Sequence, residues 1–161
     1  YTTTDNGRDG KVYGLELAYN QPWTFLPGFL SGFGIQSSLS FINGSFDTPS
    51  GRTVSFPGTS RRITNVALFY EKYGLSARVG WQHRSRWLDD ISIDASGDLY
   101  WDAQERYDFS ARYQINNHLQ LYGDINNLTD ELGVRYAGSR NRPFEVEGFG
   151  RRFLAGVRVT F

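Results

Sequence analysis

Side chains alternate between apolar and polar along seven stretches of this chain, and this alternation restricts the fold more than any other feature. The last stretch ends the chain, and its apolar set is Phe153, Ala155, Val157, Val159 and Phe161. The residues between them are mostly polar or small and include Arg152 and Arg158. Successive side chains of a β-strand point to opposite faces. A strand with this pattern lies between an apolar medium and water.

The alternation predicts strands at about residues 11–22, 32–46, 61–71, 74–87, 102–114, 118–128 and 145–161. The connections also alternate, because short ones fall at 24–31, 71–74 and 115–118 and long polar ones at 47–60, 88–100 and 129–144. Residues 1–10 read as part of a further loop. Short turns on one side, long loops on the other and long strands are typical of an antiparallel transmembrane β-barrel. The pattern is all-β and requires no helix.

Charge and composition exclude several classes of protein. Lys+Arg and Asp+Glu balance at 17 each, so no basic surface points to nucleic acid. No run approaches the ~20 apolar residues of a membrane helix. The chain has no cysteine, which fits an oxidising compartment. Because residue 1 is not methionine and no signal sequence opens the chain, we expect a piece or a processed form of a longer protein.

The apolar faces meet either a sealed core, as in a soluble barrel, or lipid, as in a membrane barrel. Three features favour lipid. The polar faces carry many charges, and the final apolar-face residue, Phe161, has no polar tail after it. Tyrosine and tryptophan fall near strand ends, as in interfacial girdles, at Tyr13, Tyr19, Trp87, Trp101, Tyr107 and Tyr113.

The last third resembles the C-terminal end of TonB-dependent outer-membrane receptors. The segments that carry the resemblance are "YDFSARYQINNHLQLYGDINNLTDE" (107–131), "RY.G" at Arg135, Tyr136 and Gly138, and "GFGRRFLAGVRVTF" (148–161). Earlier segments, "VYGLELAYNQPWTFLPG" (12–28) and "NVALFYEKYGLSARVGW" (65–81), look like preceding strands of the same family. The resemblance therefore covers nearly the whole chain.

The resemblance implies that residues 1–161 are the C-terminal section of a 22-stranded barrel, with about seven strands and without the plug domain, the TonB box and the earlier strands. Such a receptor imports a siderophore, vitamin or oligosaccharide across the Gram-negative outer membrane with energy transmitted by TonB. The implied partners are outer-membrane lipid and lipopolysaccharide, the rest of the barrel and the plug, TonB through missing N-terminal parts, and the barrel-assembly machinery. The alternatives are a small self-contained barrel with a passive-pore or structural role, and a soluble β-barrel binding protein.

The resemblance and the alternation also suggest roles for particular residues. The closing strand is similar to the signal read by the barrel-assembly machinery, which implies that role for Phe153, Val157, Val159 and Phe161. Charges on the predicted lumen face are Glu16, Arg78, Arg84, Arg106, Asp108, Arg112, Arg152 and Arg158. Candidate extracellular ligand contacts combine aromatic rings with charges, and they are Trp87, Asp89, Asp90, Tyr100, Trp101, Arg135, Tyr136 and Arg140.

The sequence predicts neither a cofactor nor an enzyme. His83 and His118 have no close third ligand that would complete a metal site. The aspartates of the 86–101 loop lack the ordered spacing of a calcium loop. No nucleophile and base are convincingly placed for hydrolysis.

Overall fold

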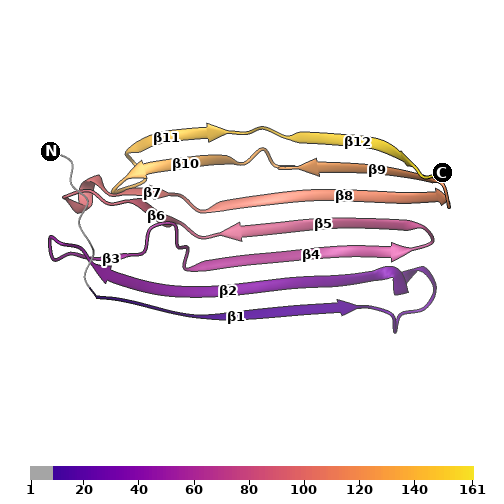
Figure 1. The fold of residues 1–161 in the computed structure, drawn as a ribbon, viewed down its shortest axis with the longest axis horizontal. Helices are drawn as coiled ribbons and strands as arrows, with labels where there is room; N and C mark the ends of the chain where they lie inside the picture. The colour runs from indigo at the N-terminus through magenta and orange to yellow at the C-terminus, as the bar shows by residue number, and fades with distance from the viewer. Residues whose placement is uncertain (1–8) are drawn as a thin grey trace.

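The computed structural model describes residues 9–161, which form one large antiparallel sheet with a smaller sheet at one end (Figure 1). Residues 1–8, most of the first predicted loop, lie outside the described residues. The described part of the chain contains two short 3-10 helices, η1 (Gly28–Gly32) and η2 (Ala95–Gly97), and no α-helix. No helix in residues 9–161 is long and apolar enough to cross a membrane.

Seven long strands follow the chain in a simple up-and-down order, each antiparallel to the next. They are β1 (Gly10–Pro22), β2 (Phe33–Asp47), β4 (Arg62–Lys72), β5 (Leu75–Arg84), β8 (Gln104–Asn116), β9 (Leu119–Asn126) and β12 (Arg152–Val159). β1 and β12 form the two edges, and no pairing joins them. The predicted all-β arrangement of seven antiparallel barrel strands is confirmed, with the barrel left open.

The strand register keeps apolar side chains on the same side of neighbouring strands. Val79 on β5 pairs with Leu68 on β4 and with Phe109 on β8. One position along, Arg78 pairs with Ser110 and points to the other side. We call the side with Val79 the apolar face and the side with Arg78 the polar face. A slip of one residue would exchange the two faces, so the alternation in the sequence fixes the register.

Tight connections join the strands at the end of the sheet that holds the C-terminus (Figure 1). Between β4 and β5, Tyr73 and Gly74 both have positive φ, at 54° and 76°. Two consecutive positive φ values make a type I′ turn, whose twist suits a two-residue hairpin. The β1–β2 connection contains η1, and Lys72 Nζ donates to Gly28 O at 2.6 Å there.

The long connections are not plain loops, because they form strands of their own. Residues 47–60 contain β3 (Thr53–Ser55), which extends β2 into a hairpin. Parts of the other two build a second sheet from β6 (Trp87–Asp90), β7 (Leu99–Trp101), β10 (Leu132–Ala137) and β11 (Pro143–Gly148) in the order β11-β10-β7-β6. We call this the loop sheet. It lies beyond the end of the large sheet opposite the tight turns (Figure 1).

The closing strand is shorter than the predicted 145–161. β11 ends at Gly148 and β12 begins at Arg152, with Gly150 at φ +71° between them. Apolar residues alternate in both strands, but they fall at even positions in β11 (Phe144, Val146) and at odd positions in β12 (Phe153, Val157), so the phase changes at the break. Gly150 is a second signal, since glycine enters positive φ without the steric penalty of a side chain.

Buried apolar side chains are few and lie mostly outside the large sheet. The buried ones among the described residues are Ala67, Trp87, Leu88 and Tyr136. On the large sheet, by contrast, Tyr107, Val157 and Val159 are 36%, 57% and 53% exposed. The apolar face of this chain therefore covers no sealed core.

Candidate functional site: the polar face and the loop sheet

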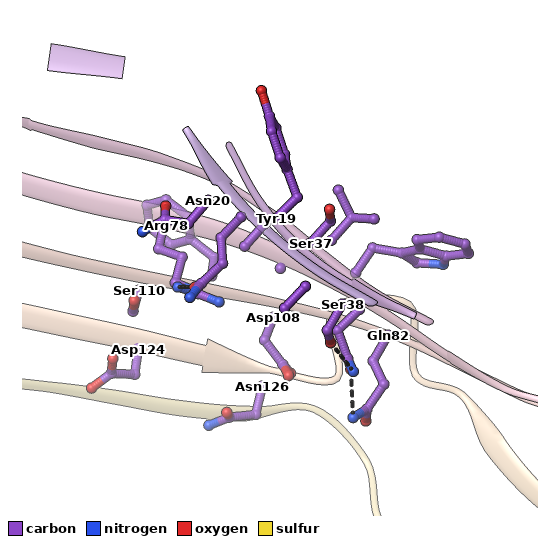
Figure 2. A pocket seen from close by; sticks show the side chains of 18 of the residues that line it. Tyr19, Asn20, Ser37, Ser38, Arg78, Gln82, Asp108, Ser110, Asp124 and Asn126 are labelled. Atoms are coloured by element: carbon purple, nitrogen blue, oxygen red, sulfur yellow. Dashed lines mark hydrogen bonds between the residues drawn. The ribbon is translucent and has the colours of Figure 1, made fainter. Parts of the chain in front are cut away.

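An open cavity of about 790 Å³ runs along the polar face and draws residues from all seven strands (Figure 2). Asp108, Asp124 and Asn126 lie on this side, while the ring of Tyr19 points to the opposite side. The polar and charged side chains of the lining that lie on the polar face are Asn20, Gln36, Ser38, Asn65, Arg78, Gln82, Asp108, Ser110, Asp124, Asn126 and Arg152. The cavity is suited to water or to a polar surface packed against it.

Hydrogen bonds across strands order part of this cavity (Figure 2). Gln82 Nε2 donates to Asn65 Oδ1 at 3.0 Å, and Asn65 Nδ2 donates to Ser38 Oγ at 3.0 Å. The three side chains come from β5, β4 and β2 in turn. Beside them Arg78 Nη1 donates to Gln36 Oε1 at 2.7 Å. Neutral side chains and the bond from Arg78 to Gln36 thus fix this part of the wall.

The register places all eight of the predicted lumen charges on the polar face. Four of them are held locally. Arg112 lies 3.5 Å from Asp124, and Arg84 Nε donates to Ser60 Oγ at 2.7 Å. Arg78 donates to Gln36, and Asp108 Oδ1 accepts the Asn127 N–H at 2.9 Å. Within residues 9–161, no ion pair is made by Glu16, Arg78, Arg106, Asp108, Arg152 or Arg158. Of these, Glu16, Arg106, Arg152 and Arg158 are free to meet another part of the protein or a polar solute.

The apolar face carries charge only near the ends of its strands. Those residues are Lys11, Asp47, Arg62, His83 and Glu105 at the loop-sheet end and Lys72 at the turn end. Aromatic rings lie just inside these limits, at Tyr13, Trp81 and Tyr107 on one side and Tyr70 and Tyr113 on the other. This order of charge, ring and aliphatic band is typical of a strand surface that crosses a bilayer.

Aromatic pairs stabilise the loop sheet, and their rings belong to four of the eight candidate ligand contacts. Trp87 stacks on Trp101 with ring centroids 6.1 Å apart, and Tyr100 stacks on Tyr136 at 5.7 Å. The Arg84 guanidinium lies 3.6 Å from the centre of a Trp87 ring. Tyr136 is only 1% exposed, so its ring is not available to a ligand in this arrangement. Trp87 and Trp101, placed by the sequence in a membrane girdle, belong to this small core instead.

Most of the charged candidates in the loops already have partners. Arg135 bridges Asp89 and Glu145, the latter at 3.2 Å. Arg140 lies 2.6 Å from Asp102. Asp90 is exposed, and its carboxylate accepts only the neighbouring Ile91 N–H at 2.8 Å. Among the eight, Asp90 is therefore the residue most open to a ligand, and ligand contact remains a prediction for the set.

Asp98 joins three loops, and no local pattern in the sequence indicates this role. It is 2% exposed and forms an ion pair with Arg52 from the β2–β4 connection. Its Oδ1 accepts Ser92 N–H at 2.9 Å, and its carbonyl accepts Gly138 N–H at 2.8 Å. A buried carboxylate needs such compensation, because desolvation penalises its charge. The role of Asp98 is visible only in the folded structure, where the three loops come together.

The pKa values of two groups at the loop sheet are raised, one chiefly by burial and the other chiefly by a hydrogen bond. The pKa of Tyr100 is raised, first by burial and then by the negative charge of Asp98. The pKa of Arg86 is raised, chiefly because its side chain donates to Tyr136 OH at 3.5 Å. Arg86 therefore stays charged beside the two stacked tyrosines, while Tyr100 stays neutral above its usual range.

Three of the four residues of the predicted assembly signal lie on the apolar face of the edge strand β12, and the fourth, Phe161, follows the strand. Phe153, Val157 and Val159 pair with Ile125, Leu121 and Leu119 of β9. The other edge of β12 is open, and Phe161 lies beyond the last paired residue, fully exposed. An open edge with a regular apolar row is a template for strand addition.

No cluster of three or more histidine, aspartate or glutamate residues in the described range is placed to hold a metal ion. The two histidines lie at opposite ends of the large sheet. His83 contacts Glu105 at 3.3 Å, and His118 contacts the Thr160 carbonyl at 2.9 Å.

Comparison with known proteins bears on both the sequence and the fold. A family model described as "TonB dependent receptor-like, beta-barrel" matches residues 1–128. No curated protein sequence matches the chain. Among solved structures, the siderophore receptor PiuA from Acinetobacter baumannii has a similar fold, with a TM-score of 0.67 at 20% identity. At that identity the likeness establishes the fold alone. The match covers 93% of this chain and 22% of that receptor, so the chain spans about a fifth of its length.

Proposed function

The chain belongs to the TonB-dependent receptor family, and from this premise we propose that it is the closing section of an active transporter that imports a scarce nutrient. Members of the family are transporters of the Gram-negative outer membrane and not enzymes. In the proposal, residues 1–161 supply about the last seven strands of a 22-stranded barrel. The earlier strands, the plug and the TonB box belong to the remainder of the receptor.

The observation that carries the proposal is the two-faced sheet. Between Arg62 and Lys72 on β4, the apolar face shows Thr64, Val66, Leu68 and Tyr70 and no charge. The same strand presents Asn65 and Ala67 to the polar face. Lipid on the first side and a wet lumen on the second satisfy both sets of side chains. Because the cavity lies on the polar face, the exposed apolar rows lie on the side away from it, where contact with water would cost free energy.

The open edges support membership in a larger barrel over a self-contained small one. Unpaired N–H and C=O groups along β1 and β12 would each cost several kcal/mol in hydrocarbon. In the proposal, β1 pairs with the preceding strand and β12 with the first strand of the receptor. The free charges of the polar face then meet the plug, whose displacement by TonB opens the path.

The substrate is a siderophore, a vitamin or an oligosaccharide, and uptake assays distinguish these classes. Cells that lack the receptor gene are compared with complemented cells for uptake of a labelled ferric siderophore, cobalamin and a maltooligosaccharide. We expect one class to depend on the gene and to lose uptake when an uncoupler abolishes the proton-motive force. Gene-dependent uptake that persists with the uncoupler would indicate a passive pore and contradict the proposal.

Loss of the loop contact at Asp90 provides the residue-level test. Asp90→Ala should weaken uptake through the apparent affinity, because the exposed carboxylate is proposed to meet the substrate. Asp94→Ala is the matched control, since Asp94 is also exposed in the same loop. Equal kinetics for the two variants would remove Asp90 from the ligand contacts.

A further inference from the structure

Three connections gather at the loop-sheet end of the large sheet and contact one another there (Figure 1). They join β2 to β4 (48–61), β5 to β8 (85–103) and β9 to β12 (127–151). We call the three together the collar. The collar contains the loop sheet, in which β7 of the second connection pairs with β10 of the third. The remaining contacts decide whether the three connections can move separately.

Arg52 fastens the first connection to the second. Its Nη1 donates to the carbonyl oxygens of Ser92 and Ile93 at 2.7 and 3.2 Å, and its Nη2 forms the ion pair with Asp98. The guanidinium therefore binds three oxygen atoms of the second connection at once. The Asp98 side chain is 2% exposed. Separation of the two connections would leave this buried carboxylate without its partner, which is strongly unfavourable.

A second contact between the same two connections lies beside the large sheet. Gly58 N–H donates to the Leu88 carbonyl at 2.7 Å, and Ser60 forms a β-bridge with Trp87. Arg84, the last residue of β5, donates to the Gly58 carbonyl at 2.6 Å and to the Ser60 hydroxyl at 2.7 Å. Because Arg84 belongs to a long strand, these bonds fix the first connection to the large sheet as well as to the second connection.

Polar bonds add to the strand pairing between the second and third connections. Gly138 N–H donates to the Asp98 carbonyl at 2.8 Å, and Arg142 Nη1 donates to the Ser96 carbonyl at 3.1 Å. Tyr136, from the third connection, is 1% exposed. Asp98 thus contacts the first connection through its side chain and the third through its backbone. The third connection cannot leave the second without exposing a buried ring and breaking these bonds.

We propose that the collar is one preformed body, fixed to the end of the large sheet, which keeps its shape while substrate enters the receptor. The inference rests on the proposed function, since it concerns the entrance of the same transporter. It assigns to the three connections the role of a static wall, and it rejects a lid that closes by separate movement of these loops. Any movement that encloses the substrate then belongs to other parts of the receptor.

Distances between pairs of spin labels in the intact receptor in bilayers test the single body. This chain has no cysteine, so paired cysteines can be placed at the exposed positions Ser50, Ile93 and Asn141, one in each connection. We expect one narrow distance for each of the three pairs, and also for Ile93 with Leu17 on β1. Labels at Leu17 and Tyr107 on the long strands give the width of a rigid pair. Broad or multiple distances within the collar would overturn the proposal.

The Arg52→Gln variant tests the first link, because it removes the positive partner of Asp98. We expect a broader distance between Ser50 and Ile93 and an unchanged distance between Ile93 and Asn141. Arg61→Gln is the matched control, since Arg61 is exposed in the same connection and no ion pair within residues 9–161 uses it. Heat-modifiable migration in gels verifies that both variants are folded. Equal distance distributions in the two variants would overturn the proposal.

A disulfide across the loop sheet tests the consequence for transport. Leu99 pairs with Ala137 beside the hydrogen-bonded pair of Asp98 and Gly138, so their Cα atoms lie about 4.5 Å apart, within reach of a disulfide. Cells with Leu99→Cys/Ala137→Cys should take up the labelled ferric siderophore, cobalamin or maltooligosaccharide equally well with the cysteines oxidised or reduced. The Leu99→Cys variant controls for the substitution itself. Loss of uptake on oxidation that a reductant restores would overturn the static wall.

The spin-label and uptake experiments separate this inference from the proposed function. If uptake of none of the three compounds depends on the gene, the proposed function fails, while narrow distances still support a rigid collar. If uptake depends on the gene and on the proton-motive force but the distances are broad, this inference alone fails.

Discussion

Arg62 and Lys72 lie on the same side of β4, ten residues apart, and no charged side chain lies between them on that side. Ten residues of strand span about 33 Å at a rise of ~3.3 Å each. At a tilt of about 40° from the membrane normal, this span covers a thickness of about 25 Å, which matches the apolar band of an outer-membrane barrel. The lysine amine turns beyond the strand end, where it donates to Ser31 Oγ as well as to Gly28 O.

A charge placed in the middle of the apolar band should destabilise the barrel. Val79→Arg lies between Leu68 and Phe109, and we expect a loss of about 2–4 kcal/mol with less heat-resistant folded protein in gels. Gly80→Arg is the matched control. Position 80 pairs with Asp108 on the polar face, and a Cβ there meets open space. Equal losses for the two variants would contradict the assignment of the faces.

The loop sheet should open locally when its buried carboxylate is removed. Asp98→Ala leaves Arg52 without its carboxylate partner and Ser92 N–H without an acceptor, at a cost of about 3 kcal/mol. Hydrogen exchange should increase in residues 88–100, while β8 and β9 keep their protection. Asp94→Ala, which removes an exposed carboxylate from the same loop, should leave exchange unchanged. Faster exchange throughout the strands would show that Asp98 does not act locally.

The raised pKa of Tyr100 makes the stability of the loop sheet depend on pH in the alkaline range. Because its pKa is raised in the folded state, the folded form binds the phenolic proton more tightly than the unfolded form does. This contribution to stability is complete below the ordinary tyrosine pKa and is lost as the pH rises through the raised value. Absorbance at the phenolate band should show one late-titrating tyrosine that Tyr100→Phe removes. A late component that survives this substitution would assign it to another residue.

Deleting Phe161 should reduce assembly without reducing stability. The ring lies beyond the last residue pair and is fully exposed, so it adds little to the folded sheet. We expect less receptor in the outer membrane of cells, but an unchanged unfolding midpoint for protein refolded in detergent. Thr160→Ala controls for a change beside the terminus. A lower midpoint for the deletion would assign Phe161 a structural role instead.

The alternation predicts the seven long strands, because one-sided burial of a strand imposes period two on its residues. It also predicts the sides of Arg78, Asp108 and Arg158. The alternation does not predict the loop sheet, because β6, β7 and β10 are short and pair across long stretches of sequence. Arg52 and Asp98 meet 46 residues apart, and nothing local to either residue indicates the contact.

The most direct test is to determine which side of the sheet meets lipid. The described chain has no cysteine, so single cysteines at residues 106–113 on β8 can carry spin labels in the intact receptor in bilayers. Labels at Tyr107, Phe109, Ala111 and Tyr113 should respond to oxygen dissolved in lipid, and labels at Arg106, Asp108, Ser110 and Arg112 to a water-soluble nickel complex. The opposite alternation, or uniform access of the nickel complex, would contradict the placement of the apolar face in the membrane.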